Sequence, residues 1–250
     1  MYKTKIKKNI NSNAFIEKRI VNYWNKRSKD FSNKRRQELD SLNGEAWLEL
    51  INKHIPANQS LKVLDVGTGA GFFATLKSSQ GHKVIGIDMS PKMILEAKKN
   101  MIACNHHAEF KVMNAQKLDF EDESFDVVIS RNLTWTLPDV MQAYREWHRV
   151  LKTDGLLMNF DSDYGDKNFR NEQTCSITNI DTDMLDECNA IKNSLKISTH
   201  TRPIWDVNFL RNLNFKVDYD LDIAPMVQRD DKLDYDSVPL FAIYAKKLSR

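Results

Sequence analysis

Long apolar runs, paired cysteines and a strong excess of one charge are all missing from this 250-residue chain. No run approaches the roughly 20 apolar residues of a membrane-spanning helix, and no apolar stretch follows the first lysines as in a secretory signal. The cysteines, Cys104, Cys175 and Cys188, are scattered and odd in number, which excludes a disulfide framework and a CxxC metal site. These absences predict a protein of the reducing cytoplasm with no membrane partner.

The formal net charge is only +3, too little for a committed nucleic-acid binder. The charge is nevertheless uneven, because residues 1–36 hold twelve lysines and arginines against Glu17 and Asp30 alone. We interpret this region as a solvated arm and helix face. A surface for an anionic substrate or for RNA is the alternative.

Glycine is sparse as well, yet three of the eight glycines stand at alternate positions in one turn. Residues 61–66 read as a strand buried on both faces, and Gly67, Gly69 and Gly71 follow before a helix begins at Phe72. A turn without Cβ atoms lets a ligand lie on the backbone, and the helix presents unpaired N–H groups to it. The next strand ends at Asp88, where nucleotide-binding βαβ units place an acid against ribose hydroxyls.

The spacing of the glycines separates two kinds of nucleotide site. The dinucleotide fingerprint G-x-G-x-x-G would need a glycine at position 72, which is Phe72. The spacing here is G-x-G-x-G, with Asp65 before it and Asp88 after it. This pattern resembles the first two motifs of class I S-adenosylmethionine (SAM)-dependent methyltransferases and favours SAM over a nicotinamide cofactor.

Later segments extend the resemblance over residues 61–160, and they are similar to the methyltransferase type-11 and ubiquinone/menaquinone-biosynthesis-like group. The resemblance implies that Met89 packs against adenine. Asn114-Ala115 stands where the family usually has Asp-Ala, whose acid and following N–H bind the adenine ring. Asn114 departs from that pattern but can still accept through its side-chain oxygen.

The implied fold is α/β: a Rossmann-like, doubly wound, seven-stranded sheet that is mostly parallel, with strand seven antiparallel and helices on both faces. We expect an N-terminal helical extension or lid at residues 1–58. A SAM-binding core would follow at residues 59–250, with a substrate-binding insertion at about 161–201. The expected strands cover residues 61–66, 84–88, 109–113, 126–130, 156–160, 215–219 and 240–245.

Before the core, Tyr23-Trp24 and Arg27 resemble a Tyr/Phe-Trp-x-x-Arg segment that closes over the cofactor in small-molecule methyltransferases. On this resemblance Arg27 would meet the carboxylate of the methionine moiety. An aromatic helix that simply packs on the core is the alternative, with about equal weight.

Two sets of site residues follow from the motifs and the resemblance. The expected cofactor-binding residues are Tyr23, Arg27, Asp65, Gly67, Thr68, Gly69, Gly71, Asp88, Met89, Asn114, Ala115, Ser130 and Arg131. The expected substrate-binding residues are Trp24, Asn132, Trp135, Asp161, Tyr164 and Arg202. No metal site is expected, since the spacing of Asp161, Asp163 and Asp166 is incomplete for one.

The predicted activity is in-line transfer of the methyl group of SAM to a small-molecule acceptor, with S-adenosylhomocysteine (SAH) as the product. No catalytic base is assigned, because the sulfonium methyl is already electrophilic and positioning alone supplies roughly 7–11 kcal/mol. Tyr164, Asp161 and His200 are the first candidates for proton transfer. The alternatives are an RNA or protein methyltransferase that uses the basic N-terminal region, and a non-catalytic SAM-binding module.

Overall fold

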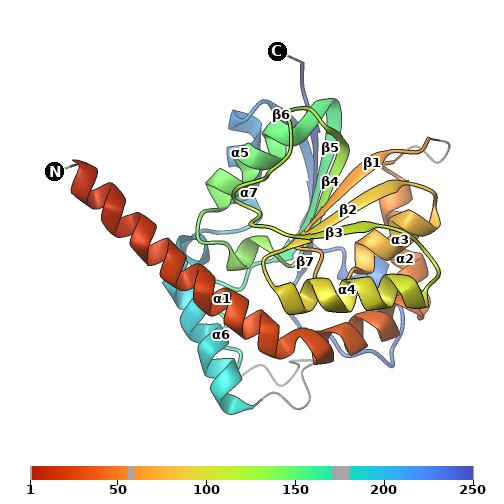
Figure 1. The fold of residues 1–250 in the computed structure, drawn as a ribbon, viewed down its shortest axis with the longest axis horizontal. Helices are drawn as coiled ribbons and strands as arrows, with labels where there is room; N and C mark the ends of the chain where they lie inside the picture. Colours follow the sequence, from red (N-terminus) through yellow and green to blue (C-terminus); the bar gives the residue numbers. More distant parts are fainter. Residues whose placement is uncertain (1, 56–58, 171–180, 250) are drawn as a thin grey trace.

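The computed structural model describes residues 2–55, 59–170 and 181–249, with side chains from residue 13 onward (Figure 1). Its centre is one seven-stranded sheet in the order β3-β2-β1-β4-β5-β7-β6. The strands are β1 (Lys62–Val66), β2 (Lys83–Asp88), β3 (Glu109–Val112), β4 (Phe125–Arg131), β5 (Leu151–Ser162), β6 (Phe215–Asp220) and β7 (Leu240–Lys247). Cys175 and the middle of the expected insertion lie outside the described residues.

The pairing of the strands confirms the predicted α/β fold. Strands β1 to β5 pair in parallel, whereas β7 is antiparallel to both β5 and β6. The predicted strand at 156–160 is longer than expected, since β5 runs from Leu151 to Ser162.

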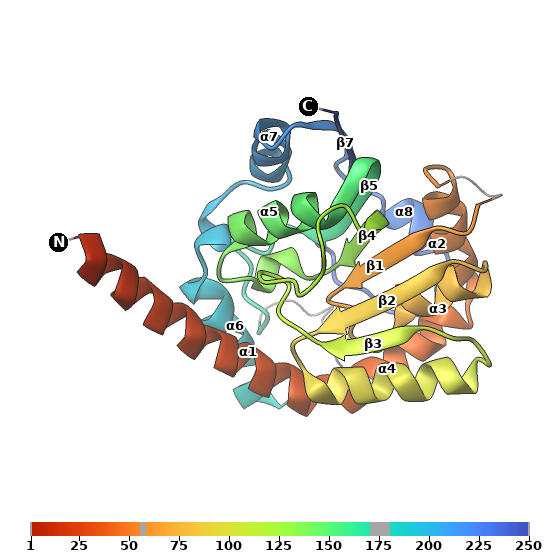
Figure 2. The same cartoon turned by 45° about the horizontal axis from the view of Figure 1, so that its top comes forward.

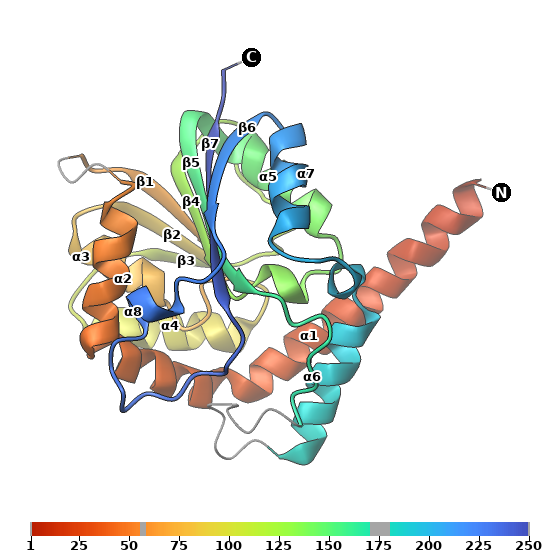
Figure 3. The same ribbon diagram turned by 180° about the vertical axis from the view of Figure 1, so that it is seen from behind.

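Helices cover both faces of the sheet, as Figure 3 shows from behind. On one face lie α2 (Leu42–Asn52), α3 (Phe72–Ser79), α4 (Pro91–Ala103) and α8 (Ala224–Val227), and on the other lie α5 (Val140–Val150) and α7 (Ile204–Asn212). Strand residues alternate between the two layers: Val127 and Ile129 pack with the α2–α4 layer, and Val128 packs with α5. This period of two is the geometry of a strand buried on both faces.

A long helix, α1 (Tyr2–Leu39), crosses the carboxyl edge of the sheet, and its N-terminal end projects beyond the core (Figure 2). It runs beside α6 (Thr182–Ser194), and two short 3-10 helices, η1 (Thr134–Thr136) and η2 (Lys196–Thr199), complete the fold. The helix after β1 lies on one face and the helix after β4 on the other, so the strand order reverses between β1 and β4. Ligands of open α/β sheets bind at such a switch point, and α1 covers this one.

No helix in the described part of the chain is both long enough and apolar enough to cross a membrane.

Candidate functional site

The turn after β1 leaves its backbone bare. Gly67, Gly69 and Gly71 have φ angles of 68°, 52° and 87°, in the left-handed region that favours glycine. A Cβ on Gly67 would also come within 2.8 Å of the Leu133 side chain. The positive φ therefore favours glycine here, and a Cβ would also force the Leu133 side chain to move.

Two buried carboxyl groups hold this turn. Asp65 accepts from the Thr68 hydroxyl at 2.5 Å and from the Ala74 backbone N–H at 3.0 Å, which fastens the end of β1 to the start of α3. Asp88, at the end of β2, accepts from the Gly69 N–H at 3.0 Å. Burial raises the pKa of Asp65 to about 7 and that of Asp88 to about 6. Of the two, Asp88 lines the pocket beside the turn, where a ligand that donates to it would favour the ionised form.

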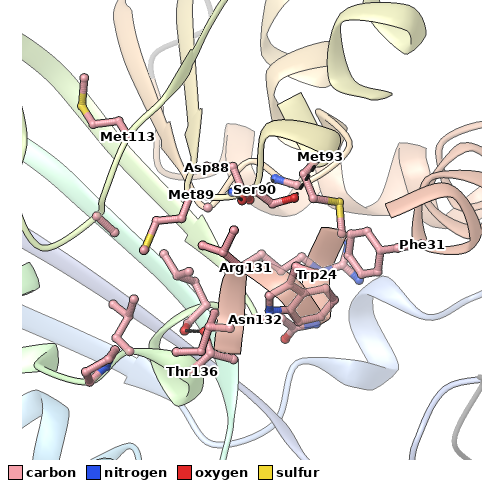
Figure 4. Close-up of a pocket in the computed structure, with 18 residues that line it drawn as sticks. Trp24, Phe31, Asp88, Met89, Ser90, Met93, Met113, Arg131, Asn132 and Thr136 are labelled. Carbon is pink, nitrogen blue, oxygen red and sulfur yellow. Dashed lines mark hydrogen bonds between the residues drawn. The ribbon is translucent and has the colours of Figure 1, made fainter. Parts of the chain in front are cut away.

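A pocket with about 700 Å³ of empty space, part of it open to solvent, lies against the glycine turn. We call it the glycine-turn pocket, and Figure 4 shows Asp88 and Ser90 opposite Asn132 and Thr136. Its described lining residues are Ile20, Val21, Trp24, Phe31, Gly67, Gly69, Asp88, Met89, Ser90, Met93, Met113, Ala115, Arg131, Asn132, Leu133, Thr136, Leu137 and Pro138. An acid, thioethers and bare backbone therefore meet in one hollow at the switch point.

Helix α1 forms the roof of this pocket. The Phe31 ring lies so close to the turn that a Cβ on Gly69 would be 3.1 Å from it, and Trp24 packs edge-on against Phe31 at 5.5 Å. The roof is anchored to the α4 region, because the Ser90 hydroxyl donates to Asn25 at 2.7 Å. Farther along α4, the Asn100 amide donates to Ser32 at 3.0 Å. Helix α1 therefore covers the glycine-turn pocket in this structure.

A second pocket, with about 1010 Å³ of empty space including open solvent, adjoins the first. The two share Trp24, Phe31, Arg131 and Asn132. We call it the aromatic pocket; its described lining residues are Tyr23, Trp24, Arg27, Phe31, Lys34, Arg35, Arg131, Asn132, Trp135, Ser162, Tyr164, Phe169, Leu185, Cys188, Gln228, Tyr235, Asp236, Val238 and Leu240. All of these residues are buried or half-buried, and part of the pocket is open to solvent.

An ion-pair cluster ties the end of α1 to the end of β4 beside both pockets. Glu38 contacts Arg131 at 2.7 Å and Arg35 at 2.6 Å. Burial opposes ionisation of Glu38, but the two guanidinium groups outweigh it and lower its pKa to about 2. We call Arg35, Glu38 and Arg131 the open cluster, because both arginines line a pocket.

The structure brings together most of the predicted cofactor-binding residues. Lining the glycine-turn pocket are Gly67, Gly69, Asp88, Met89, Ala115 and Arg131. Asp65 and Thr68 line a smaller cavity beside it, and Gly71 caps the start of α3. The Asn114 amide instead donates to Glu17 of α1 at 3.1 Å, and Ser130 is fully buried and lines neither pocket.

The remaining predicted residues divide between the aromatic pocket and the core. Tyr23 and Arg27 line the aromatic pocket and are not among the residues that line the glycine-turn pocket. The expected substrate residues Trp24, Asn132, Trp135 and Tyr164 line the aromatic pocket too. Asp161 and Arg202 line neither.

Asp161 and Arg202 belong to a cluster inside the core. Arg202 donates to both carboxylate oxygens of Asp206, at 2.9 and 2.8 Å, and its guanidinium lies 3.5 Å from Asp161. Asp161 accepts from the Trp135 backbone N–H at 3.1 Å and from the Thr134 hydroxyl. We call Asp161, Arg202 and Asp206 the sealed cluster; it holds η1, whose residues line the pockets.

Sequence reasoning did not assign Arg35, Glu38 or Tyr235 to the site. Arg35 and Glu38 stand three residues apart on a helix, the ordinary spacing of a solvated ion pair. Nothing in that spacing distinguishes a buried pair at a pocket from one on the surface. Within the described residues, no group of three or more His, Cys, Asp or Glu side chains is arranged to hold a metal ion.

Comparison with known proteins agrees with the motifs. Residues 64–159 match the type-11 family model described as "Methyltransferase domain". Demethylmenaquinone methyltransferase of Chlorobaculum parvum is 36% identical over 104 residues, which are 41% of this chain and 42% of that protein. The chain thus covers about two fifths of the length of the curated relatives it first matches.

Solved structures extend the similarity of fold to most of the chain. A SAM-dependent methyltransferase from Mesorhizobium loti aligns with a TM-score of 0.60 and 18% identity over 84% of this chain and 100% of that one. The [4+2]-cyclase SpnF aligns with a TM-score of 0.55 and 15% identity over 82% of this chain and 80% of that one. The same fold therefore carries more than one chemistry, and the site must supply the argument for function.

Proposed function

We propose that this chain, whose residues 64–159 carry a methyltransferase domain, binds SAM in the glycine-turn pocket and transfers its methyl group to a small molecule in the aromatic pocket. The chemistry that SAM supplies is an electrophilic methyl on a sulfonium, which becomes the neutral thioether of SAH when the methyl moves. The acceptor atom gains the methyl and gives up a proton if it carries one.

One observation carries the proposal: the bare glycine turn and Asp88 line the same pocket. Asp88 sits one strand over from the turn, where its carboxylate can accept from two ribose hydroxyls. Met89 and Met113 offer polarizable walls that suit a flat base.

Unpartnered polar atoms also fit a ligand at this place. Asn132 Oδ1 and Arg131 Nε are buried without a hydrogen-bond partner, and both residues border the two pockets. A buried polar atom without a partner costs about 1–3 kcal/mol. A bound ligand that supplies the missing partners would recover that energy.

The contact between the pockets supports transfer in line. Trp24, Phe31, Arg131 and Asn132 belong to both linings, so ligands in the two hollows would meet at these residues. Helix α1 covers the pockets, so bound ligands would displace water from them, and the residues would mainly align the reactants. The lining of the aromatic pocket consists of buried and half-buried side chains, and a concave site of this kind favours a small molecule over an RNA or protein surface.

The first test is calorimetry with SAH. The wild-type chain is expected to bind it, and Asp88→Asn is expected to bind at least tenfold more weakly because the amide cannot accept from two hydroxyls as well as a carboxylate does. Asp218→Asn, an exposed carboxyl on β6, is the matched control and should bind like the wild type. A well-folded sample that gives no heat with SAH would contradict the proposal.

The second test identifies the acceptor. Labelled SAM is incubated with the protein and a fractionated cell extract, and the labelled product is analysed. Label in a small molecule supports the proposal. Label in RNA or in protein would instead favour an RNA or protein methyltransferase. SAH binding without any transfer would favour a non-catalytic SAM-binding module.

A further inference from the structure

Arg27 is a buried cation without a carboxylate partner among the described residues. The residue is only 8% exposed to solvent. One guanidinium nitrogen donates to the Tyr23 hydroxyl at 3.0 Å, and Nε is buried with no hydrogen-bond partner. A charge taken out of water is costly unless it is paired. The position of Arg27 therefore calls for an anion that these residues do not supply.

The lining of the aromatic pocket carries an excess of positive charge around this guanidinium. Arg27, Lys34, Arg35 and Arg131 line the pocket, and Asp236 is the acidic residue in its described lining. Glu38, which does not line the pocket, forms ion pairs with both Arg35 and Arg131. Four cations therefore face two carboxylates, which leaves a formal excess of two positive charges.

Aromatic side chains in the lining form two groups with tilted or edge-on ring contacts. Trp135, Tyr164 and Phe169 contact one another with ring centroids 4.9 to 5.7 Å apart. Trp24 and Phe31 of α1 form the other group. Aromatic rings at these separations suit a flat, apolar ligand that packs against their faces and edges.

We propose, resting on the proposed function, that the acceptor is a flat aromatic molecule with an acidic group, and that Arg27 binds this group in the aromatic pocket. The guanidinium can hold a carboxylate with two parallel N–H donors. Trp135 and Tyr164 hold the ring, and Asn132 stands where the ring faces the glycine-turn pocket.

The placement of Arg27 separates this role from binding of the methionine carboxylate. Arg27 lines the aromatic pocket and is not among the described residues that line the glycine-turn pocket. Arg131 lines both, as well as the cavity beside Asp65, so it is the arginine placed to meet the methionine end of the cofactor. The two arginines thus serve different ligands.

The test measures the affinity of two matched probes, 2-naphthoate and its uncharged amide 2-naphthamide, with and without saturating SAH. The full chain is expected to bind naphthoate at least tenfold more tightly than the amide. Arg27→Met should remove this preference and leave the affinities for naphthamide and SAH within about twofold of wild type. Arg27→Lys should keep part of the preference, and Lys29→Met, an exposed cation on the same helix, should change nothing.

Three outcomes would overturn the proposal. The amide could bind as tightly as the acid, neither probe could bind, or Arg27→Met could weaken SAH and leave naphthoate unchanged. The last result would assign Arg27 to the cofactor. Failure of the underlying function is distinguishable, because it appears as absent SAH binding in the wild type, whatever the probes do.

Discussion

The sealed and the open cluster are both built on buried arginines, yet they face different surroundings. In the sealed cluster, the side chains of Arg202 and Asp206 are 2% and 0% exposed, and Tyr144 donates a further hydrogen bond to Asp206 at 2.6 Å. Although burial alone lowers it, the two aspartates raise the pKa of Arg202 above its usual value. In the open cluster, one carboxylate serves two arginines that border the pockets.

The difference shows how charge balance distinguishes a cluster that stabilises the fold from one that can bind a ligand. The sealed cluster has two carboxyl groups for one guanidinium and lines neither pocket, so the charge of Arg202 is balanced within the protein, even though its Nη1 makes no hydrogen bond. The open cluster has two guanidinium groups for one carboxylate and leaves the Nε atoms of Arg35 and Arg131 without partners. The first positions η1, and the second keeps binding capacity for a ligand.

The largest expected effect comes from breaking the sealed cluster. Arg202→Met would leave Asp161 and Asp206 buried without a cation, and the free energy of unfolding should fall by about 3–5 kcal/mol. Urea denaturation measures it. Arg229→Met, which breaks an exposed pair with Glu49, is the control and should cost less than about 1 kcal/mol. Equal losses in the two variants would show that the sealed cluster is not structural.

A smaller and more local effect is expected from the open cluster. Glu38→Gln removes the charge that Arg35 and Arg131 share, at a cost of about 2 kcal/mol, because the charged hydrogen bonds to the carboxylate are lost. Amide hydrogen exchange should rise in the last turns of α1 while the central strands stay protected. Asp30→Asn, an exposed acid on the same helix, provides the baseline. Faster exchange across the whole sheet would contradict a local tie.

The smallest effect extends the comparison to single carboxyl groups. Burial raises the pKa of Asp88, to about 6, and also that of Asp161. The two differ in their surroundings, because Asp88 lines a pocket and Asp161 lies inside the sealed cluster. A ligand that donates to Asp88 favours the ionised form, so below pH 6 binding must first release a proton. SAH affinity should therefore fall about tenfold, or about 1.4 kcal/mol, between pH 7.5 and pH 5.

Calorimetry at the two pH values measures this effect, and Asp88→Asn should show a smaller fall than the wild type. An affinity that is the same at pH 5 and pH 7.5 would mean that binding does not draw on the ionised carboxylate of Asp88.

The strands, the glycine turn and Asp88 could be predicted because their signals are local. Buried strands are short apolar runs, and the turn is three glycines within five residues. The prediction placed Arg202 and Asp161 at the substrate and Arg27 at the cofactor, whereas the structure places the first two in the core and Arg27 in the aromatic pocket. Residue type and position along the chain do not reveal whether a side chain lines a pocket or packs in the core.

The sequence by itself determined the doubly wound sheet and the bare turn at its edge, because backbone conformation and apolar periodicity act over a few neighbouring residues. Only the tertiary structure decided the aromatic pocket, whose walls come from α1, the β4–η1 segment, the end of β5, α6 and the chain before β7. Arg131, at the border of that pocket, pairs with Glu38, which lies 93 residues away along the chain. Their pairing depends on how the long α1 helix packs across the sheet, which no local pattern encodes.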